Sequence, residues 1–266
     1  MIVAYLHLLG FNLILVMGLM SGLWGIYYIR RNSGIVDLGW TFSFSLIMGG
    51  CILMSDGWEP RKWLLAGMVW IWSFRLLRHI YKRYITTDED PRYQEIRKKW
   101  GTRYVDLKVY FMFIFQGLIA LVLSLPFFIV SMNKSDSWSI FEGWGVILWF
   151  IGVCGEALAD KQLRDFKNNP ENEGHVCQRG LWNYSRHPNY FFEFVTWLGF
   201  GVFALGSTGG LLGLISPLLM LILLLKVSGI PLAEEQSLKS KPVAYKKYQQ
   251  TTSAFVPWFK TENRDE

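Results

Sequence analysis

The stretch GLWNYSRHPNYFFE, residues 180–193, gathers hydrogen-bonding side chains directly in front of an apolar run. They are Tyr184, Arg186, His187, Asn189, Tyr190 and Glu193. Ionisable groups are costly within a bilayer and tend to mark functional sites there. The stretch therefore indicates a binding site for a large polar cofactor. The alternative is an interfacial belt, with aromatic rings at headgroup level and Arg186 reaching for water, but a belt does not explain Asn189 and Glu193.

A second set of charged side chains lies upstream, where another apolar run ends. Glu156, Asp160, Arg164 and Lys167 follow an i, i+4, i+8, i+11 pattern, which places them on one face of a continuous helix. Carboxylates suit ribose hydroxyls and basic groups suit phosphates, so the stripe favours a nucleotide site. The alternative is a set of acid–base pairs that each stabilise the helix by roughly 0.2–0.5 kcal/mol.

Asp37 stands inside an otherwise apolar segment, IVDLGW. A carboxyl group in such a place usually faces a cavity or a charged partner, so Asp37 either lines a pocket or pairs with an arginine such as Arg75. Arg75, Arg78 and His79 share one helical face and are typical either of a phosphate site or of side chains reaching the membrane boundary. Further on, Glu234 and Glu235 begin an amphipathic segment and serve either as a favourable helix N-terminus or as part of the site.

The composition indicates a polytopic, all-α membrane protein. Hydrophobic residues make up 52% of the 266 residues, aromatic residues 17%, and the mean hydropathy is +0.23. The three cysteines form no CxxC pair and predict neither a disulfide framework nor a metal site. The net charge of +6 is explained by basic cytoplasmic loops, so we expect no nucleic-acid partner.

Seven segments are apolar over the length that crosses a bilayer, which is about 20 residues. The predicted spans are 2–28, 35–54, 63–80, 110–131, 141–159, 190–205 and 211–227, in one membrane domain that covers residues 1–266, with 228–266 as an amphipathic cytoplasmic tail. Alternate loops then hold 24 of the 27 Lys and Arg residues, all except Arg61, Lys62 and Lys134. Because basic loops face the cytoplasm, the N-terminus is predicted outside and the C-terminus inside.

The motif residues resemble a known superfamily. GLWNYSRHPNYFFE, with ALADKQLRDF upstream, SGIPLAEE downstream and VDLGW in the second span, resembles the DUF1295 branch of the steroid 5-alpha-reductase family over most of the chain. RHPNY with an acid three residues on is also similar to the motif of sterol C14 and C7 reductases. The same region is similar, less completely, to isoprenylcysteine carboxyl methyltransferases, which share RHPxY and a later EE pair.

The resemblance implies a seven-helix fold in a bacterial inner membrane, with NADPH bound in a cavity that faces the cytoplasm. By position it assigns Asp160 and Arg164 to the nucleotide, with Glu156 and Lys167 in the places of a family Asn and Arg. It assigns Asn189 and Glu193 to the nicotinamide half. It matches Tyr184, Arg186, His187 and Tyr190 to the sterol-reductase motif, and Asp37 to an acid that meets the substrate carbonyl.

We therefore expect an oxidoreductase that uses NADPH to reduce an enone-type carbon–carbon double bond in a steroid-like or other lipid from the bilayer. Asp37, Tyr190 and Glu193 are the expected catalytic residues, and a protonated Asp37 is expected to donate to the carbonyl oxygen. The first alternative is an S-adenosylmethionine-dependent methyltransferase that uses the same pocket. The second is a lipid-binding membrane protein without catalysis.

Overall fold

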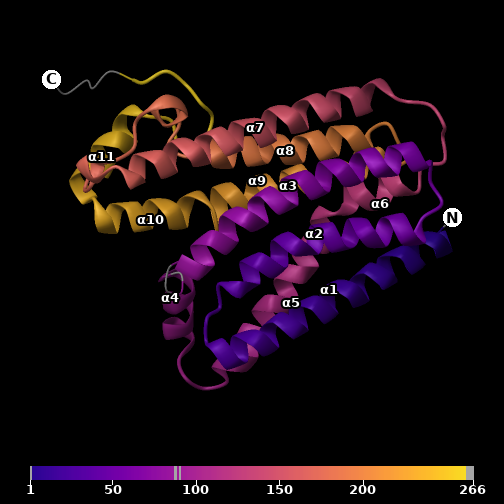
Figure 1. Ribbon diagram of the computed structural model, residues 1–266, viewed down its shortest axis with the longest axis horizontal. Helices are drawn as coiled ribbons and strands as arrows, with labels where there is room; N and C mark the ends of the chain where they lie inside the picture. Colours follow the sequence, from indigo (N-terminus) through magenta and orange to yellow (C-terminus); the bar gives the residue numbers. More distant parts are fainter. Residues whose placement is uncertain (1, 87–88, 90, 262–266) are drawn as a thin grey trace. The chain divides into compact units, whose positions relative to one another are not determined.

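The computed structural model describes residues 2–86, 89 and 91–261, and this part of the chain is helical without a β-strand (Figure 1). The chain divides into two compact units. Unit 1 comprises Met1–Glu142 and Phe203–Ser216, and unit 2 comprises Gly143–Val202 and Pro217–Glu266. The predicted all-α class is therefore confirmed for the described residues.

Unit 1 is built on long apolar helices that pack side by side. Its elements are α1 (Ile2–Arg30), α2 (Ile35–Met54), α3 (Glu59–Thr86), α4 (Pro91–Trp100), α5 (Val105–Leu123), α6 (Leu125–Ser131) and the short helix η3 (Gly210–Leu214). Helix α1 packs against α2 and α5, and α2 packs against α3 (Figure 1). Tyr27, Phe44, Trp72 and Phe113 are buried in this unit and form part of its core.

Unit 2 is built on two long helices and a C-terminal helical segment. Its elements are α7 (Ile140–Asn168), η1 (Pro170–Asn172), η2 (Gly180–Asn183), α8 (Pro188–Ala204), α9 (Ile215–Ile222), the π-helical turn η4 (Leu223–Val227), α10 (Ile230–Ser240) and α11 (Pro242–Thr251). In each of the helices α7, α8 and α9, the boundary between the two units falls within a few residues of one end of the helix. Helices α10 and α11 pack against each other (Figure 1).

Glycines bring the backbones of α7 and α8 close together. A β-carbon on Gly152 would lie 2.5 Å from the backbone nitrogen of Thr196, and one on Gly199 would lie 2.5 Å from that of Trp149. Small residues permit this approach, which is how apolar helices associate where lipid offers no hydrophobic driving force. The contact holds the middle of α8 against α7, and the motif residues lie at the start of α8.

Five helices are long and apolar enough to cross a membrane. They are Val3–Arg30, Ile35–Met54, Val105–Leu123, Ile140–Asn168 and Gly210–Ser240, and the search covers the described residues. Large apolar side chains such as Ile14, Phe111, Phe115 and Phe150 are exposed on these helices. Such surfaces are rare on soluble proteins, and a bilayer would cover them. The chain is therefore an integral membrane protein.

Each of the seven predicted spans coincides with helical structure, but three differ in detail. The predicted span 110–131 divides into α5 and α6 at Ser124, because Pro126 in the first turn of α6 cannot continue a helix. The predicted span 190–205 corresponds to α8, which has 17 residues. Helix α3 extends beyond the predicted span at both ends.

Candidate functional site

The motif is held against α7 by hydrogen bonds at its start. Gly180 has a φ of +58°, and a β-carbon there would lie 2.4 Å from the side chain of Gln162. The Leu181 amide donates to Gln162 Oε1 at 2.9 Å, and Trp182 Nε1 donates to the Ala159 carbonyl at 2.9 Å. A glycine is required here because both its φ and the close approach exclude a side chain.

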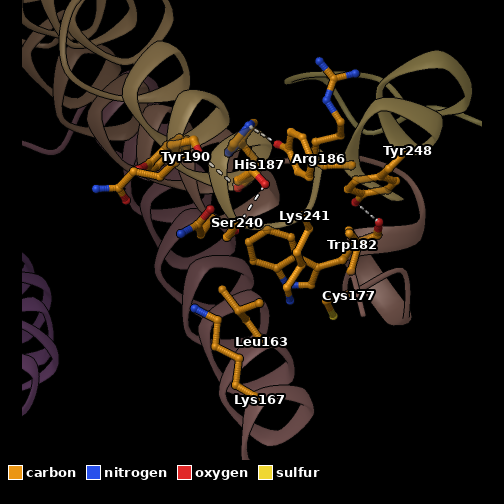
Figure 2. Close-up of a pocket in the computed structure, with 16 residues that line it drawn as sticks. Leu163, Lys167, Cys177, Trp182, Arg186, His187, Tyr190, Ser240, Lys241 and Tyr248 are labelled. Carbon is orange, nitrogen blue, oxygen red and sulfur yellow. Dashed lines mark hydrogen bonds between the residues drawn. The ribbon is translucent and has the colours of Figure 1, made fainter. Parts of the chain in front are cut away.

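A cavity of about 350 Å³ opens where the motif, α7 and the C-terminal segment meet within unit 2 (Figure 2). Its lining residues are Leu163, Lys167, Val176, Cys177, Trp182, Arg186, His187, Asn189, Tyr190, Ala233, Gln236, Ser237, Ser240, Lys241, Tyr245 and Tyr248. Figure 2 shows Leu163 and Lys167 on α7, and Ser240 and Lys241 on the C-terminal segment. The volume is in the range of small-molecule sites, about 300–1,000 Å³.

Asn189 presents a buried amide at this cavity. Its Nδ2 donates to Asp160 Oδ1 at 3.4 Å, so the predicted α7 carboxylate orients the amide. Its Oδ1 is buried and has no hydrogen-bond partner within the described part of the chain. A buried amide oxygen without a partner costs free energy, which a ligand with an N–H group would recover.

His187 and Tyr190 form a flat aromatic wall. Their rings stack with centroids 5.4 Å apart and an interplanar angle of 8°, and both line the cavity (Figure 2). The two residues are three positions apart across the first turn of α8, and this spacing brings their side chains onto one face. Such a wall suits a planar ligand group.

Arg186 lines the cavity, but its guanidinium is bound by the protein. Nε donates to Glu234 Oε1 at 2.7 Å, and Nη1 donates to the carbonyls of Gln249 at 3.0 Å and Thr252 at 2.6 Å. The Glu234 carboxylate therefore offsets the charge of Arg186. A cofactor-binding role for Arg186 stays a prediction, while Lys167 and Lys241 supply the other positive charges of the lining.

Glu234 is the hub of the contacts behind the cavity. Besides Arg186 it meets His187 Nε2 at 3.3 Å and the Tyr245 hydroxyl at 3.5 Å, and it accepts from Gln249 Nε2 at 2.8 Å. The neighbouring Glu235 pairs with Lys239 at 2.9 Å, and both of these side chains are more than half exposed. Sequence reasoning had left these two acids undistinguished, and it did not select Lys241.

Two phenols of α11 stay protonated at this site. Burial, followed by the negative charge of Glu234, raises the pKa of Tyr245 to about 12. Burial also raises the pKa of Tyr248, whose hydroxyl donates to the carbonyls of Trp182 and Ser185 (Figure 2). Both tyrosines therefore act as hydrogen-bond donors at physiological pH.

The other predicted residues of unit 2 lie in different surroundings. Glu156 is buried and Arg164 is exposed, and neither lines the cavity. Glu193 is buried and accepts from Trp197 Nε1 at 2.9 Å, one helical turn further along α8. Tyr184 is exposed, and its ring contacts Phe259 edge-on. The structure thus brings Lys167, Arg186, His187, Asn189 and Tyr190 to one cavity and places Asp160 behind them.

Asp37 belongs to unit 1 and has partners of its own there. The Tyr93 hydroxyl donates to Asp37 Oδ1 at 2.5 Å, and Arg83 and Arg92 each place an Nη2 3.4 Å from Oδ2. These donors favour the ionised carboxylate, so the prediction that a protonated Asp37 donates a hydrogen bond is at odds with the geometry. Burial and the charge of Asp37 raise the pKa of Tyr93 well above its usual value, so Tyr93 is the donor of this pair.

Comparison with known proteins places the chain among proteins without an assigned activity. Residues 23–252 match the model of a family described as "Protein of unknown function (DUF1295)". An uncharacterized protein of the fission yeast Schizosaccharomyces pombe is 28% identical over 267 aligned positions, which cover 88% of this chain and 75% of the relative. No solved structure matches the chain.

Proposed function

This chain belongs to the DUF1295 family, and on that premise we propose that it is an NADPH-dependent membrane reductase of an activated carbon–carbon double bond in a lipid. The proposal includes seven spans, with the cavity of unit 2 facing the cytoplasm. The coincidence of every predicted span with helix, and the concentration of Lys and Arg in alternate loops, support that topology.

The charge of the cavity lining carries the proposal. The lining includes Lys167 and Lys241 beside Arg186, whose charge Glu234 offsets, and none of the described lining residues is an aspartate or glutamate. Such a lining favours an anionic ligand with phosphates over S-adenosylmethionine, whose sulfonium and amino groups call for acidic partners. The cofactor of a reductase fits this charge better than the cofactor of a methyltransferase.

The residues of the cavity fit the parts of NADPH in a consistent way. The partnerless Oδ1 of Asn189 suits the amide N–H of a nicotinamide, and the His187–Tyr190 wall suits its planar ring. Lys167 and Lys241, which also line the cavity, would offset phosphate charge. NADPH bound there would supply a hydride for addition to the β-carbon of an enone.

Hydride addition leaves negative charge on the carbonyl oxygen of the substrate, and a hydrogen-bond donor at that oxygen lowers the barrier by about 3 kcal/mol. Within unit 2, Tyr190 lines the cavity, and its phenol O–H is the group that we assign to this role. Turnover of Tyr190→Phe, measured beside the exposed control Tyr104→Phe, tests this role.

The cofactor is tested by thermal-shift titration of the purified full-length protein with NADPH, NADH and S-adenosylmethionine. A ligand that binds the folded state raises its apparent stability by mass action. We expect NADPH to stabilise the wild type, and Asn189→Ala to weaken its binding about tenfold because one buried hydrogen bond is lost. Asn168→Ala, at the exposed end of α7, is the matched control.

Two results would overturn the proposal. Stabilisation by S-adenosylmethionine alone would make the protein a methyltransferase and move the search to methyl acceptors. No stabilisation by any of the three compounds would favour a lipid-binding protein without catalysis.

A further inference from the structure

Residues 253–261, the short segment that follows α11, hold two large aromatic side chains in exposed positions. Trp258 is 68% exposed and Phe259 is 75% exposed. Their ring centroids lie 6.3 Å apart, and the Phe259 ring lies 6.1 Å from that of Tyr184. On a chain with membrane-spanning helices, an exposed aromatic cluster of this kind is typical of anchors in the interfacial layer of the bilayer.

Hydrogen bonds fix this segment to the rest of unit 2. They join the Trp258 amide to the Tyr184 carbonyl (2.9 Å), Lys260 Nζ to Gln178 Oε1 (2.8 Å) and the Thr261 amide to the Thr251 carbonyl (3.0 Å). The backbone before and after the aromatic pair is therefore held in place. The two rings are therefore exposed on a segment whose backbone is held in place.

A second cavity, of about 470 Å³, lies beside the segment within unit 2. Its lining residues are Gln178, Val243, Ala244, Lys247, Tyr248, Thr251, Lys260 and Thr261. Two ammonium groups, from Lys247 and Lys260, meet mostly apolar walls, and among residues 2–261 the lining includes no aspartate or glutamate. A cavity that combines paired positive charge with apolar walls fits an amphiphile with an anionic headgroup.

We propose that this cavity binds the headgroup of an anionic phospholipid, with Lys247 and Lys260 at the phosphate and with Trp258 and Phe259 in the interfacial layer beside it. Each lysine near an anionic lipid surface contributes binding energy, so two lysines contribute about twice as much as one. A free anion would use the lysines but would leave the aromatic pair uncovered. The proposal does not depend on the reductase assignment, because it concerns another cavity and another ligand.

The test is a titration of the detergent-solubilised full-length protein with phosphatidylglycerol, and with phosphatidylcholine as the neutral lipid. Retained lipid is counted by native mass spectrometry, and stability is followed by thermal shift. We expect the wild type to retain phosphatidylglycerol in preference to phosphatidylcholine. The double variant Lys247→Gln/Lys260→Gln should bind phosphatidylglycerol about 30-fold more weakly.

The matched control is Lys246→Gln, which removes an exposed lysine from the same helix but outside the cavity. This control should behave as the wild type. If Lys246→Gln lost about half as much affinity as the double variant on a logarithmic scale, each lysine would count equally, only net charge would matter, and the headgroup site would be wrong. Equal retention of the two lipids by the wild type would also show that the headgroup site is wrong.

Two further arms separate the parts of the proposal. Inorganic phosphate should not reproduce the stabilisation by phosphatidylglycerol, and if it does, the cavity is a free-anion site. The variant Trp258→Ser/Phe259→Ser should weaken retention of both lipids while keeping the preference for phosphatidylglycerol. Unchanged retention in that variant would show that the aromatic pair does not contribute to lipid binding.

Discussion

Each unit of the protein contains a shielded arginine–glutamate pair, and the two pairs differ in what surrounds them. In unit 1, Arg61 binds Glu142, and its guanidinium also donates to three carbonyls, those of Asn133 (3.2 Å), Ser135 (2.7 Å) and Ser137 (2.6 Å). In unit 2, Arg186 binds Glu234 and donates to two carbonyls. Both arginines thus tie distant backbone segments together.

The difference lies in access and in chemistry. The Arg61 and Glu142 side chains are each 1% exposed, whereas those of Arg186 and Glu234 are 10% and 17% exposed. Glu142 accepts its other described bond from a backbone amide, that of Ser139. Glu234 also reaches His187 and Tyr245, and both of these line a cavity. A sealed pair serves the fold, while a pair connected to ionisable groups at a cavity can also position a site.

Glu142→Gln should have the largest effect on stability. The substitution leaves the Arg61 charge buried without a counter-charge, and breaking a buried pair in this way costs about 3–5 kcal/mol. The free energy of unfolding, measured by denaturant titration in detergent micelles, should fall by that amount. NADPH affinity of the folded protein should not change.

The control for this prediction is Asp56→Asn, which breaks the exposed pair with Lys134 and should leave stability unchanged. If Glu142→Gln were as stable as the wild type, the pair in unit 1 would not be the fold determinant that its burial indicates.

Glu234→Gln should have a smaller effect on stability and a clear effect on the ligand. The neutral amide no longer offsets Arg186 or orients His187, so we expect a loss of about 1.5–3 kcal/mol in stability and about tenfold weaker NADPH binding. Thermal-shift titration measures both quantities.

Glu235→Gln is the matched control, because the adjacent acid pairs with Lys239 and both of these side chains are more than half exposed. It should match the wild type in both measurements. If Glu234→Gln and Glu235→Gln had the same stability and the same NADPH affinity, the special role assigned to Glu234 would be wrong.

The smallest predicted effect is a pH dependence confined to unit 2. Because the pKa of Tyr245 is raised from 10.0 to about 12 in the folded protein, its contribution to stability is present below pH 10 and is lost as the pH rises through 12. Tyr245→Phe should therefore lose less stability between pH 10 and pH 12 than the wild type. The comparison uses thermal melts at matched ionic strength, and identical slopes would contradict the assigned environment of Tyr245.

Helices could be located from the sequence because a membrane span needs about 20 apolar residues, and such runs are visible without a partner. The motif at the start of α8 could also be identified from the sequence, because Arg186, His187, Asn189 and Tyr190, which line one cavity, are close together in the chain. The search for apolar runs missed the break between α5 and α6 at Ser124, because the apolar run continues through that residue.

Side chains that act through distant partners could not be assigned in this way. For Asp37 the sequence predicts either a pocket or a pair with an arginine such as Arg75, and the structure places Tyr93 and two other arginines, from α3 and α4, around it. For Arg186 the sequence gives no sign of its partner, an acid 48 positions away, which holds its guanidinium at the cavity. In both cases the missing information was a long-range contact.

The sequence alone determined that the chain is helical, that it lies in a membrane and that residues 180–193 are unusually polar for their position. Only the tertiary structure decided between Glu234 and Glu235, which are chemically alike and adjacent. Successive residues of an α-helix point about 100° apart around its axis, so one of two neighbours can face a packed site while the other faces away. Which one does so depends on how α10 is rotated against the motif, and that rotation is set by packing.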